Sequence, residues 1–335
     1  MRAMTTPVEP IISKPFRWAD QARPILALSP MADMTDSPFC LVAKERGAKI
    51  MFREMVSAEA VVRGNEKTLG MTAFDERERP LIQQIFGAEP HTMAEAARII
   101  EEKYHPDGID INMGCPVYKI VHNFNGACLM KDHVRAAAII RAMKAVITVP
   151  LSVKIRLGWS RSDEALTFIQ HLEAAGADLV TVHGRTKEQG YSGKSDWEMI
   201  GRVVKQVQIP VLANGDVHQP EQVPQILDVT GAAGVLIARG ALGNPWFFQH
   251  AEEVLATGSI QTPVSLHERL TTMLQHAQLH IEHYGERGIV TFRKHISWYL
   301  KGLVNIKPFR EQAMKVQSLD ELVALTAHFL TTVVE

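Results

Sequence analysis

The 335-residue sequence contains little cysteine and no long apolar segment. Its three cysteines, Cys40, Cys115 and Cys128, form neither a CxxC pair nor a zinc-ligand spacing, which indicates free thiols in a reducing compartment and predicts no metal. No uncharged apolar run approaches the roughly 18 residues of a membrane-spanning helix, and the N-terminal stretch lacks the apolar core of a secretory signal. We therefore expect a cytoplasmic, monomeric protein without a membrane partner.

Charge of one sign is also lacking, since the formal net charge is −1. This balance gives no global signal for nucleic acid, but it allows a local basic surface. Between residues 287 and 315 the chain carries seven lysines and arginines and a single acidic residue, Glu311. Arg293, Lys294 and Lys301 lie close together on one predicted helix and are our candidates for RNA contacts. The alternative is an ordinary solvated helix face.

Eight short β-rich runs recur along the chain, and amphipathic helical patterns lie between them. The runs cover residues 24–30, 49–54, 81–87, 108–114, 151–158, 179–184, 210–215 and 234–240. Apolar strands that alternate with helices indicate a parallel sheet buried on both faces. Eight such units predict a (β/α)8 TIM barrel. The alternative, an open doubly wound sheet, predicts a glycine-rich turn after the first strand, where the sequence ALSPMADMTD has none.

The strand pattern ends before residue 257, and only helical periodicity follows. The sequence therefore predicts an α/β protein with an N-terminal arm (1–19), a TIM barrel (20–256) and a small all-helical C-terminal domain (257–335). Within the barrel, the pairs Ser162–Asp163 and Ser195–Asp196 are predicted to cap the helices that follow them.

Polar residues concentrate at the carboxyl ends of the predicted strands, where TIM barrels carry their chemistry. A single asparagine or histidine in such a place usually caps a loop. Lys154 is more informative, because an inward lysine needs an anionic or electron-rich partner; a structural salt bridge is the alternative. The other strand-end candidates are Gln84, Asn112, Arg156, His183, Asn214 and Arg239.

Two glycine-rich turns follow the last two strands, at residues 213–217 (ANGDV) and 237–248 (IARGALGNPWFF). Loops in this position commonly bind phosphate through backbone N–H groups and a helix N-terminus. A phosphate there, with Lys154 and Gln84 across the barrel mouth, suits flavin mononucleotide (FMN). The lysine would meet the N1/O2 edge of a reduced ring, and the amide of Gln84 would meet the pyrimidine edge.

Cys115 lies between Gly114 and Pro116 directly after the fourth strand, in a turn and not in a core element. A structural thiol is one interpretation of this position, and a redox pair with Cys128 is another. We favour a third, in which the thiol donates a proton beside a hydride source.

These motifs resemble those of a known family, the tRNA-dihydrouridine synthases, most closely the bacterial B subfamily (nitrogen-regulation-3-like). The resemblance runs from residue 24 to about 302 and rests on LSPMADMTDSPF, QIFG, DINMGCP, VKIRLGW, VHGRTKEQGYSG, IPVLANGDV, GVLIARGALGNPWFF and FRKHISWYLKG. It implies a flavin barrel with a helical tRNA-binding domain. The implied reaction is reduction of a D-loop uridine to dihydrouridine, with hydride from N5 of reduced FMN to C6, a proton to C5, and NADPH as electron donor.

The resemblance also implies roles for individual residues. Cys115 corresponds to the general acid, and Asn112 and Arg156 to residues that contact the target uracil. The implied flavin-binding residues are Pro30, Met31, Ala32, Gln84, Lys154, His183, Asn214, Gly215, Asp216, Ala238 and Arg239. The segment 117–130 after the cysteine departs from the family pattern, so its tRNA contacts are not implied. A flavin barrel that acts on a small molecule, of the dihydroorotate or dihydropyrimidine dehydrogenase type, is the alternative enzyme. A tRNA-binding protein that has lost catalysis is the alternative of another class.

Overall fold

The computed structural model describes residues 15–333, so most of the predicted N-terminal arm lies outside the described residues. Eight parallel strands form a closed barrel in which each strand pairs with the next and the last returns to the first. The strands are β1 (Ile25–Leu28), β2 (Ile50–Ser57), β3 (Leu81–Phe86), β4 (Gly108–Met113), β5 (Leu151–Gly158), β6 (Leu179–Thr186), β7 (Val211–Asn214) and β8 (Gly234–Ile237). Each coincides with a predicted run. The TIM barrel is confirmed, and closure excludes the open doubly wound sheet.

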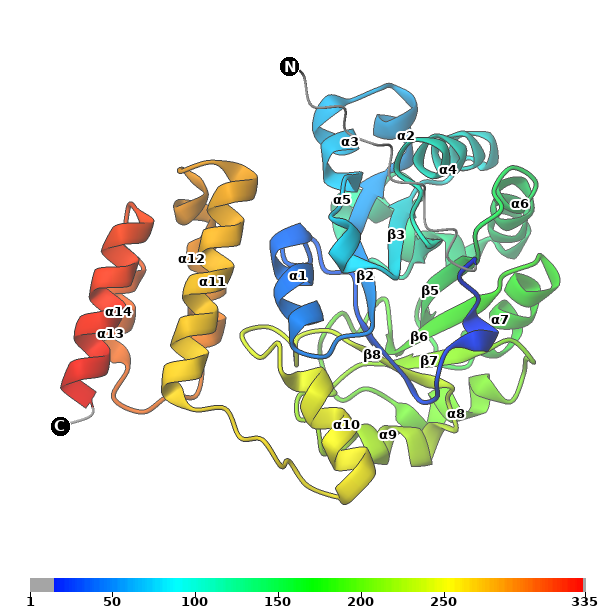
Figure 1. Ribbon diagram of the computed structural model, residues 1–335. Coiled ribbons are helices and arrows are strands. Elements are labelled where there is room, and N and C mark those ends of the chain that lie inside the picture. The colour runs from blue at the N-terminus through cyan, green and yellow to red at the C-terminus, as the bar shows by residue number, and fades with distance from the viewer. Residues whose placement is uncertain (1–14, 334–335) are drawn as a thin grey trace, which may run out of the picture.

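Helices surround the barrel on its outside (Figure 1). They are α1 (Ser37–Glu45), α2 (Ala58–Val62), α3 (Glu66–Thr72), α4 (Pro90–Tyr104), α5 (Tyr118–Val121), α6 (His133–Lys144), α7 (Glu164–Ala174), α8 (Trp197–Val204), α9 (Gln222–Thr230) and α10 (Phe247–Thr257). Short 3-10 turns occupy Trp18–Asp20, Glu76–Glu78 and Gly126–Lys131. A large apolar core fills the layer between the strands and these helices, as expected for a parallel sheet covered on its outer face.

A second apolar cluster closes the barrel at the amino ends of the strands. Trp18 stacks on Phe52, with ring centroids 6.0 Å apart, and packs with Ile25 and Leu236. Trp18 was predicted to belong to the N-terminal arm, yet it is 4% exposed. The end of that segment is therefore part of the barrel floor, which leaves the carboxyl ends of the strands as the open face.

One of the two predicted helix caps is confirmed by a hydrogen bond. Asp196 accepts the amide of Met199 at 2.8 Å at the start of α8. Asp163 precedes α7 but makes no capping bond. Its carboxylate binds Arg161 instead, and Glu164 accepts the amides of Trp159 and Arg161 at 2.6 and 2.9 Å. This predicted cap was wrong, because the Asp163 carboxylate pairs with Arg161 and does not turn toward the first amides of α7.

After α10 the described chain is helical, as predicted: α11 (Leu266–Tyr284), α12 (Gly288–Tyr299), α13 (Lys307–Ala313) and α14 (Leu319–Val333). These helices share their own core and lie beside the barrel next to α1 and α10 (Figure 1). Trp298 of α12 packs on the barrel core, and Trp246 of the barrel packs into the helical core. The turn at Gly243 passes so close to Trp298 that a Cβ there would overlap the Trp298 backbone. Across the described chain, no helix is both long enough and apolar enough to cross a membrane.

Candidate active site

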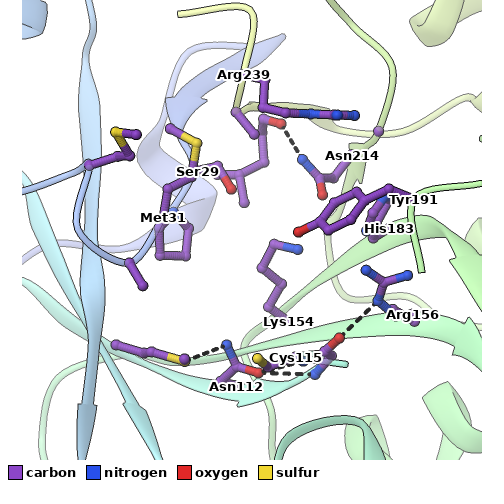
Figure 2. A pocket seen from close by; sticks show the side chains of 18 of the residues that line it. Ser29, Met31, Asn112, Cys115, Lys154, Arg156, His183, Tyr191, Asn214 and Arg239 are labelled. Atoms are coloured by element: carbon purple, nitrogen blue, oxygen red, sulfur yellow. Dashed lines mark hydrogen bonds between the residues drawn. The ribbon is translucent and has the colours of Figure 1, made fainter. Parts of the chain in front are cut away.

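A cavity of about 360 Å³ opens at the carboxyl ends of the strands, within the size range usual for ligand sites. All the predicted barrel site residues line it, and Figure 2 shows the labelled ones converging from several strands. The lining includes Pro30, Met31, Ala32, Gln84, Asn112, Cys115, Lys154, Arg156, His183, Asn214, Gly215, Asp216, Ala238 and Arg239. The prediction that these residues lie around one cavity is confirmed. The sequence did not predict the hydrogen bonds among them.

The barrel register brings the polar strand-end residues to matching levels. Arg156 of β5 lies opposite His183 of β6, which lies opposite Asn214 of β7. Paired residues on adjacent parallel strands point to the same face of the sheet, so these three side chains share one side of the cavity. One level below, Lys154 lies opposite Asn112 on β4.

A buried hydrogen-bonded chain fixes the amides of Gln84 and Asn112. The carboxylate of Asp110 accepts Gln84 Nε2 at 2.6 Å and Ser152 Oγ at 2.6 Å. Gln84 Oε1 in turn accepts Asn112 Nδ2 at 2.8 Å. Burial raises the pKa of Asp110 to about 6. Sequence reasoning missed Asp110, although it stands two positions before Asn112 and hence on the same face of β4.

Asn112 also shapes the turn that carries the thiol. Its Oδ1 accepts the amides of Gly114 and Cys115 at 3.2 and 2.9 Å. The carbonyl of Cys115 accepts the amide of Ala127 at 3.1 Å, where Gly126 adopts a φ of +59° and a Cβ would come within 2.8 Å of that carbonyl. Cys115 is therefore held on both sides: Asn112 fixes its amide, and the 126–131 turn fixes its carbonyl.

The thiol of Cys115 is half-buried and lines the cavity. Burial raises its pKa above the ordinary value, and the nearby charges of Arg156 and Lys154 only partly oppose this. The group is thus a protonated thiol at neutral pH, which is the form required of a proton donor. Cys128, the residue of the redox alternative, is buried with a relative exposure of 7%.

Lys154 projects into the middle of the cavity (Figure 2). Among residues 15–333 its ammonium makes neither an ion pair nor a hydrogen bond, so the structural salt bridge finds no partner within that range. Burial, followed by the charge of Arg156, lowers its pKa from 10.5 to about 8. A buried ammonium of this kind is stabilised by an anionic ligand edge.

Arg156 holds together the loops that frame the cavity. Its Nε donates to the carbonyl of Gly114 at 2.9 Å, and its Nη1 donates to the carbonyls of Thr186 and Gly190 at 2.8 and 2.7 Å. Tyr191 lies over this guanidinium at 5.6 Å and over that of Arg239 at 5.1 Å. Tyr191 was missed by sequence reasoning because it belongs to a loop and not to a strand end.

The turn after β7 is built on a second arginine. Arg185 Nη2 donates to Asp216 Oδ2 at 2.6 Å, and the same oxygen accepts the amide of Ser195 at 2.8 Å. Gly215 has a φ of +119°, and a Cβ there would overlap Ser195 Oγ. The carboxylate of Asp216 thus orders the turn, and residues 214–217 line the cavity. Burial lowers the pKa of His183 beside it, so this ring is neutral.

The three basic candidates of the helical part lie outside the cavity lining. Arg293 Nη2 donates to the carbonyls of Lys315 and Val316 at 3.2 and 2.6 Å, which ties α12 to the segment before α14. Lys294 is half-buried. Lys301 is exposed, and its ammonium lies 5.1 Å from the centre of the Trp298 ring. The pKa of the cavity residue His218 is lowered first by burial, then by the charge of Arg239, and also by the charge of Lys301. Of the three, Lys301 is therefore the free cation nearest the cavity mouth.

A closed parallel barrel with a thiol, a lysine and a neutral histidine around one cavity defines a TIM-barrel enzyme. The model of one family, described as "Dihydrouridine synthase (Dus)", matches residues 26–333. The chain belongs to this dihydrouridine synthase family, which confirms the resemblance found in its motifs. The family is one of flavin-dependent oxidoreductases.

Curated relatives match along most of the chain. A "tRNA-dihydrouridine synthase B" of Pseudomonas aeruginosa is 35% identical, over 91% of this chain and 92% of its own length. A "Probable tRNA-dihydrouridine synthase" of Rickettsia conorii is 35% identical, over 92% and 94%. A "Probable tRNA-dihydrouridine synthase 1" of Synechocystis sp. is 37% identical, over 88% and 82%.

Solved structures share the barrel at low identity. Histamine dehydrogenase from Rhizobium sp. 4-9 aligns with a TM-score of 0.54 and 10% identity, over 76% of this chain and 49% of that chain. A 2-naphthoyl-CoA reductase complex aligns with a TM-score of 0.53 and 12% identity, over 68% and 50%. The chain thus spans about half the length of these proteins, and the likeness concerns the fold alone.

Proposed function

We propose that this chain reduces a uridine in the D-loop of tRNA to 5,6-dihydrouridine, with FMN as cofactor and NADPH as electron donor. The observation that carries the proposal is that the Cys115 thiol and the Lys154 ammonium, which has no ion-pair or hydrogen-bond partner among residues 15–333, line one cavity of a dihydrouridine synthase barrel. We further propose that residues 20–256 form the catalytic barrel and that residues 257–335 form the tRNA-binding domain.

The cavity residues fit FMN. Lys154 offers the positive charge of a half-buried side chain to the electron-rich edge of the ring. Asp110 accepts Nε2 of Gln84 and thereby fixes the orientation of the Gln84 amide. Pro30, Met31 and Ala32 line the cavity beside them. Asn214, Gly215, Ala238 and Arg239 line the end where we expect the phosphate, with Gly215 keeping its backbone free of a Cβ. When bound, a reduced flavin would supply the hydride that uracil receives at C6.

The chain's own chemistry is a single proton transfer. Addition of hydride at C6 leaves negative charge at C5 and O4 of the uracil, and the thiol of Cys115 donates its proton to C5. Burial favours the neutral thiol before the reaction, while Arg156 and Lys154 stabilise the thiolate that results. Asn112 fixes the Cys115 turn, and Arg156 holds the adjoining loops through the carbonyls of Gly114 and Gly190.

The tRNA is expected to lie across the barrel mouth and the adjacent helices. Exposed cations on this part of the chain are Arg287, Lys301, Lys307, Arg310 and Lys315, and such cations bind phosphates with a strong dependence on salt. The target base must leave its stack to enter the cavity, as for other enzymes that act on a base.

Mass spectrometry of tRNA from a strain that lacks this protein tests the proposal. Loss of dihydrouridine at a D-loop position, restored by the wild-type gene and not by a Cys115→Ala variant, is the expected result. The purified protein should be yellow and should reduce tRNA with NADPH. An unchanged tRNA profile, together with NADPH-dependent turnover of a free pyrimidine, would replace tRNA with a small-molecule substrate.

A further inference from the structure

Four buried side chains converge where α1 of the barrel meets α11 and α12. They are Asp36, His276, His280 and His295, and one ligand atom from each lies within 4.8 Å of all the others. None of the four is more than 2% exposed. The cluster is separate from the cavity, because none of its members lines that cavity, and neither the proposed reaction nor the tRNA contacts use it.

The local structure aims these groups at one point. His276 and His280 stand four residues apart on α11 and so lie on one face of that helix, while His295 comes from the adjacent α12. Asp36 is the N-cap of α1, and its Oδ1 accepts the amide of Phe39 at 3.1 Å. Its Oδ2 faces the helical domain, where it accepts the hydroxyl of Tyr284 at 3.1 Å.

The tautomer of His280 leaves a lone pair opposite the carboxylate. The hydroxyl of Thr291 donates to the carbonyl of Gly288 at 3.0 Å, so its oxygen is free to accept Nε2–H of His280 at 2.9 Å. With its proton on Nε2, the ring presents the lone pair of Nδ1 at 3.4 Å from Asp36 Oδ2. A ring lone pair and a carboxylate oxygen at this separation in a buried site suit a cation between them.

The other two histidines present similar nitrogens. His276 Nε2, His280 Nδ1 and His295 Nε2 are all buried without a hydrogen-bond partner within residues 15–333. His276 Nδ1 lies 3.3 Å from the hydroxyl of Tyr299, which can hold that ring as an outer hydrogen-bond partner does at metal sites. Buried polar atoms are rarely left unsatisfied in native proteins, and a bound ion is one recognised partner for such a group of atoms.

We propose that Asp36, His276, His280 and His295 bind one divalent transition-metal ion, with Zn²⁺ as the best match. Three imidazole nitrogens and one carboxylate oxygen are ligands that Zn²⁺ accepts. A tetrahedral site with bonds of about 2.0–2.1 Å places neighbouring ligand atoms about 3.4 Å apart, and the distance between Asp36 Oδ2 and His280 Nδ1 is 3.4 Å. The other ligand atoms lie within 4.8 Å of one another, so binding would bring them together by at most about 1.4 Å to reach the tetrahedral separation.

Four protein ligands close the site, so its role is structural and not catalytic. The ion joins the start of α1 to α11 and α12, and α1 begins directly after the 30–34 segment that borders the cavity. It therefore fixes the helical part of the chain against the barrel. The sequence predicted no metal, because Asp36 is 240 positions from the nearest of the three histidines and no motif links them. The inference does not depend on the reaction proposed above.

The test uses the full-length protein without a histidine tag, stripped with a chelator and dialysed against Zn²⁺ or Co²⁺. We expect about one ion per chain, bound with nanomolar affinity or tighter, and a rise in the thermal unfolding midpoint. Bound Co²⁺ should show the visible absorption of a tetrahedral site, and X-ray absorption should report three imidazoles and one oxygen. Zn²⁺ binding weaker than micromolar, or a sulfur ligand, would overturn the proposal. These measurements need no variant.

A matched pair of substitutions on α11 locates the ion. His280→Gln should weaken Zn²⁺ binding by at least about 100-fold and abolish the Zn²⁺-dependent rise in the unfolding midpoint. His283→Gln changes an exposed histidine on the same helix and should bind Zn²⁺ as the wild type does. Wild-type affinity in His280→Gln would place the ion elsewhere and refute the assignment.

Discussion

Replacing Lys154 with methionine should stabilise the ligand-free protein and weaken the binding of FMN. Methionine keeps most of the aliphatic stem, which lies between Asn112 and Thr181 in the sheet register, and removes the charge. No other described residue forms an ion pair or a hydrogen bond with this ammonium, and its charge acts on the buried carboxylate of Asp110 only at longer range. We expect the wild-type lysine to destabilise the ligand-free protein, because its charge is stabilised only when an anionic ligand is bound.

The magnitude follows from the pKa of Lys154, which falls from 10.5 in the unfolded chain to about 8 in the folded one. At about 1.4 kcal/mol per pH unit, the charged form costs the folded protein roughly 3 kcal/mol at pH 7. Between pH 8 and 10.5 the unfolded chain keeps this proton while the folded protein loses it, so the stability of the wild type rises with pH in that window. The difference in free energy of unfolding between Lys154→Met and the wild type should therefore fall by roughly 3 kcal/mol as the pH rises from 7 to 10.5.

Urea titrations of both proteins at several pH values between 7 and 10.5 measure this difference, because the titrating groups that do not interact with Lys154 contribute equally to both proteins. FMN titrations should show binding weakened roughly 10- to 100-fold, as expected when a charged hydrogen bond of about 1.5–3 kcal/mol is lost. Lys67→Met, on the exposed face of α3, serves as the control and should change neither quantity. A stability difference that does not vary with pH, or undiminished FMN affinity, would refute the reasoning.

Other substitutions have equally specific outcomes. Cys115→Ala should retain FMN but reduce tRNA at least about 100-fold more slowly in single turnover, the usual contribution of a general acid; an undiminished rate would assign the proton to another group. Glu78→Gln leaves the buried guanidinium of Arg53 without its 3.0 Å ion pair and should lower the free energy of unfolding by roughly 3 kcal/mol in urea titrations, whereas an unchanged midpoint would contradict a buried pair. Lys301→Ala should lower the slope of log Kd for tRNA against log salt by about one, and Lys67→Ala should leave it unchanged; equal slopes for both would exclude Lys301 from the tRNA contact.

The elements that the sequence predicted best are those with local causes. The signal for each strand lies in its own apolar run and in the turn residues at its ends. All eight strands were therefore located, including the short β7 and β8. Because a parallel barrel brings its carboxyl ends to one rim, the polar residues found there had to converge. Cys115, Lys154 and Arg239 reached the cavity for this reason.

Hydrogen-bond partners, by contrast, could not be assigned. Arg156 was expected to contact uracil, but the structure shows its guanidinium bonded to three carbonyls of neighbouring loops. Arg293 is predicted to contact tRNA, and the structure adds a bond from its side chain to the carbonyl of Val316, which joins two parts of the helical domain. Such bonds link residues about 20 to 40 positions apart, and the spacing that permits them is set by packing and not by any local pattern.

The sequence by itself determined the barrel, its helical extension, the family and the residues at the cavity rim, since each depends on local periodicity or on short motifs. Only the tertiary structure decided that Asp110 orients Gln84, that Tyr191 covers Arg156, and that Asp36 meets three histidines from the far end of the chain. The physical reason is that side-chain contacts depend on how separate elements dock, and docking brings together residues that no spacing along the chain relates.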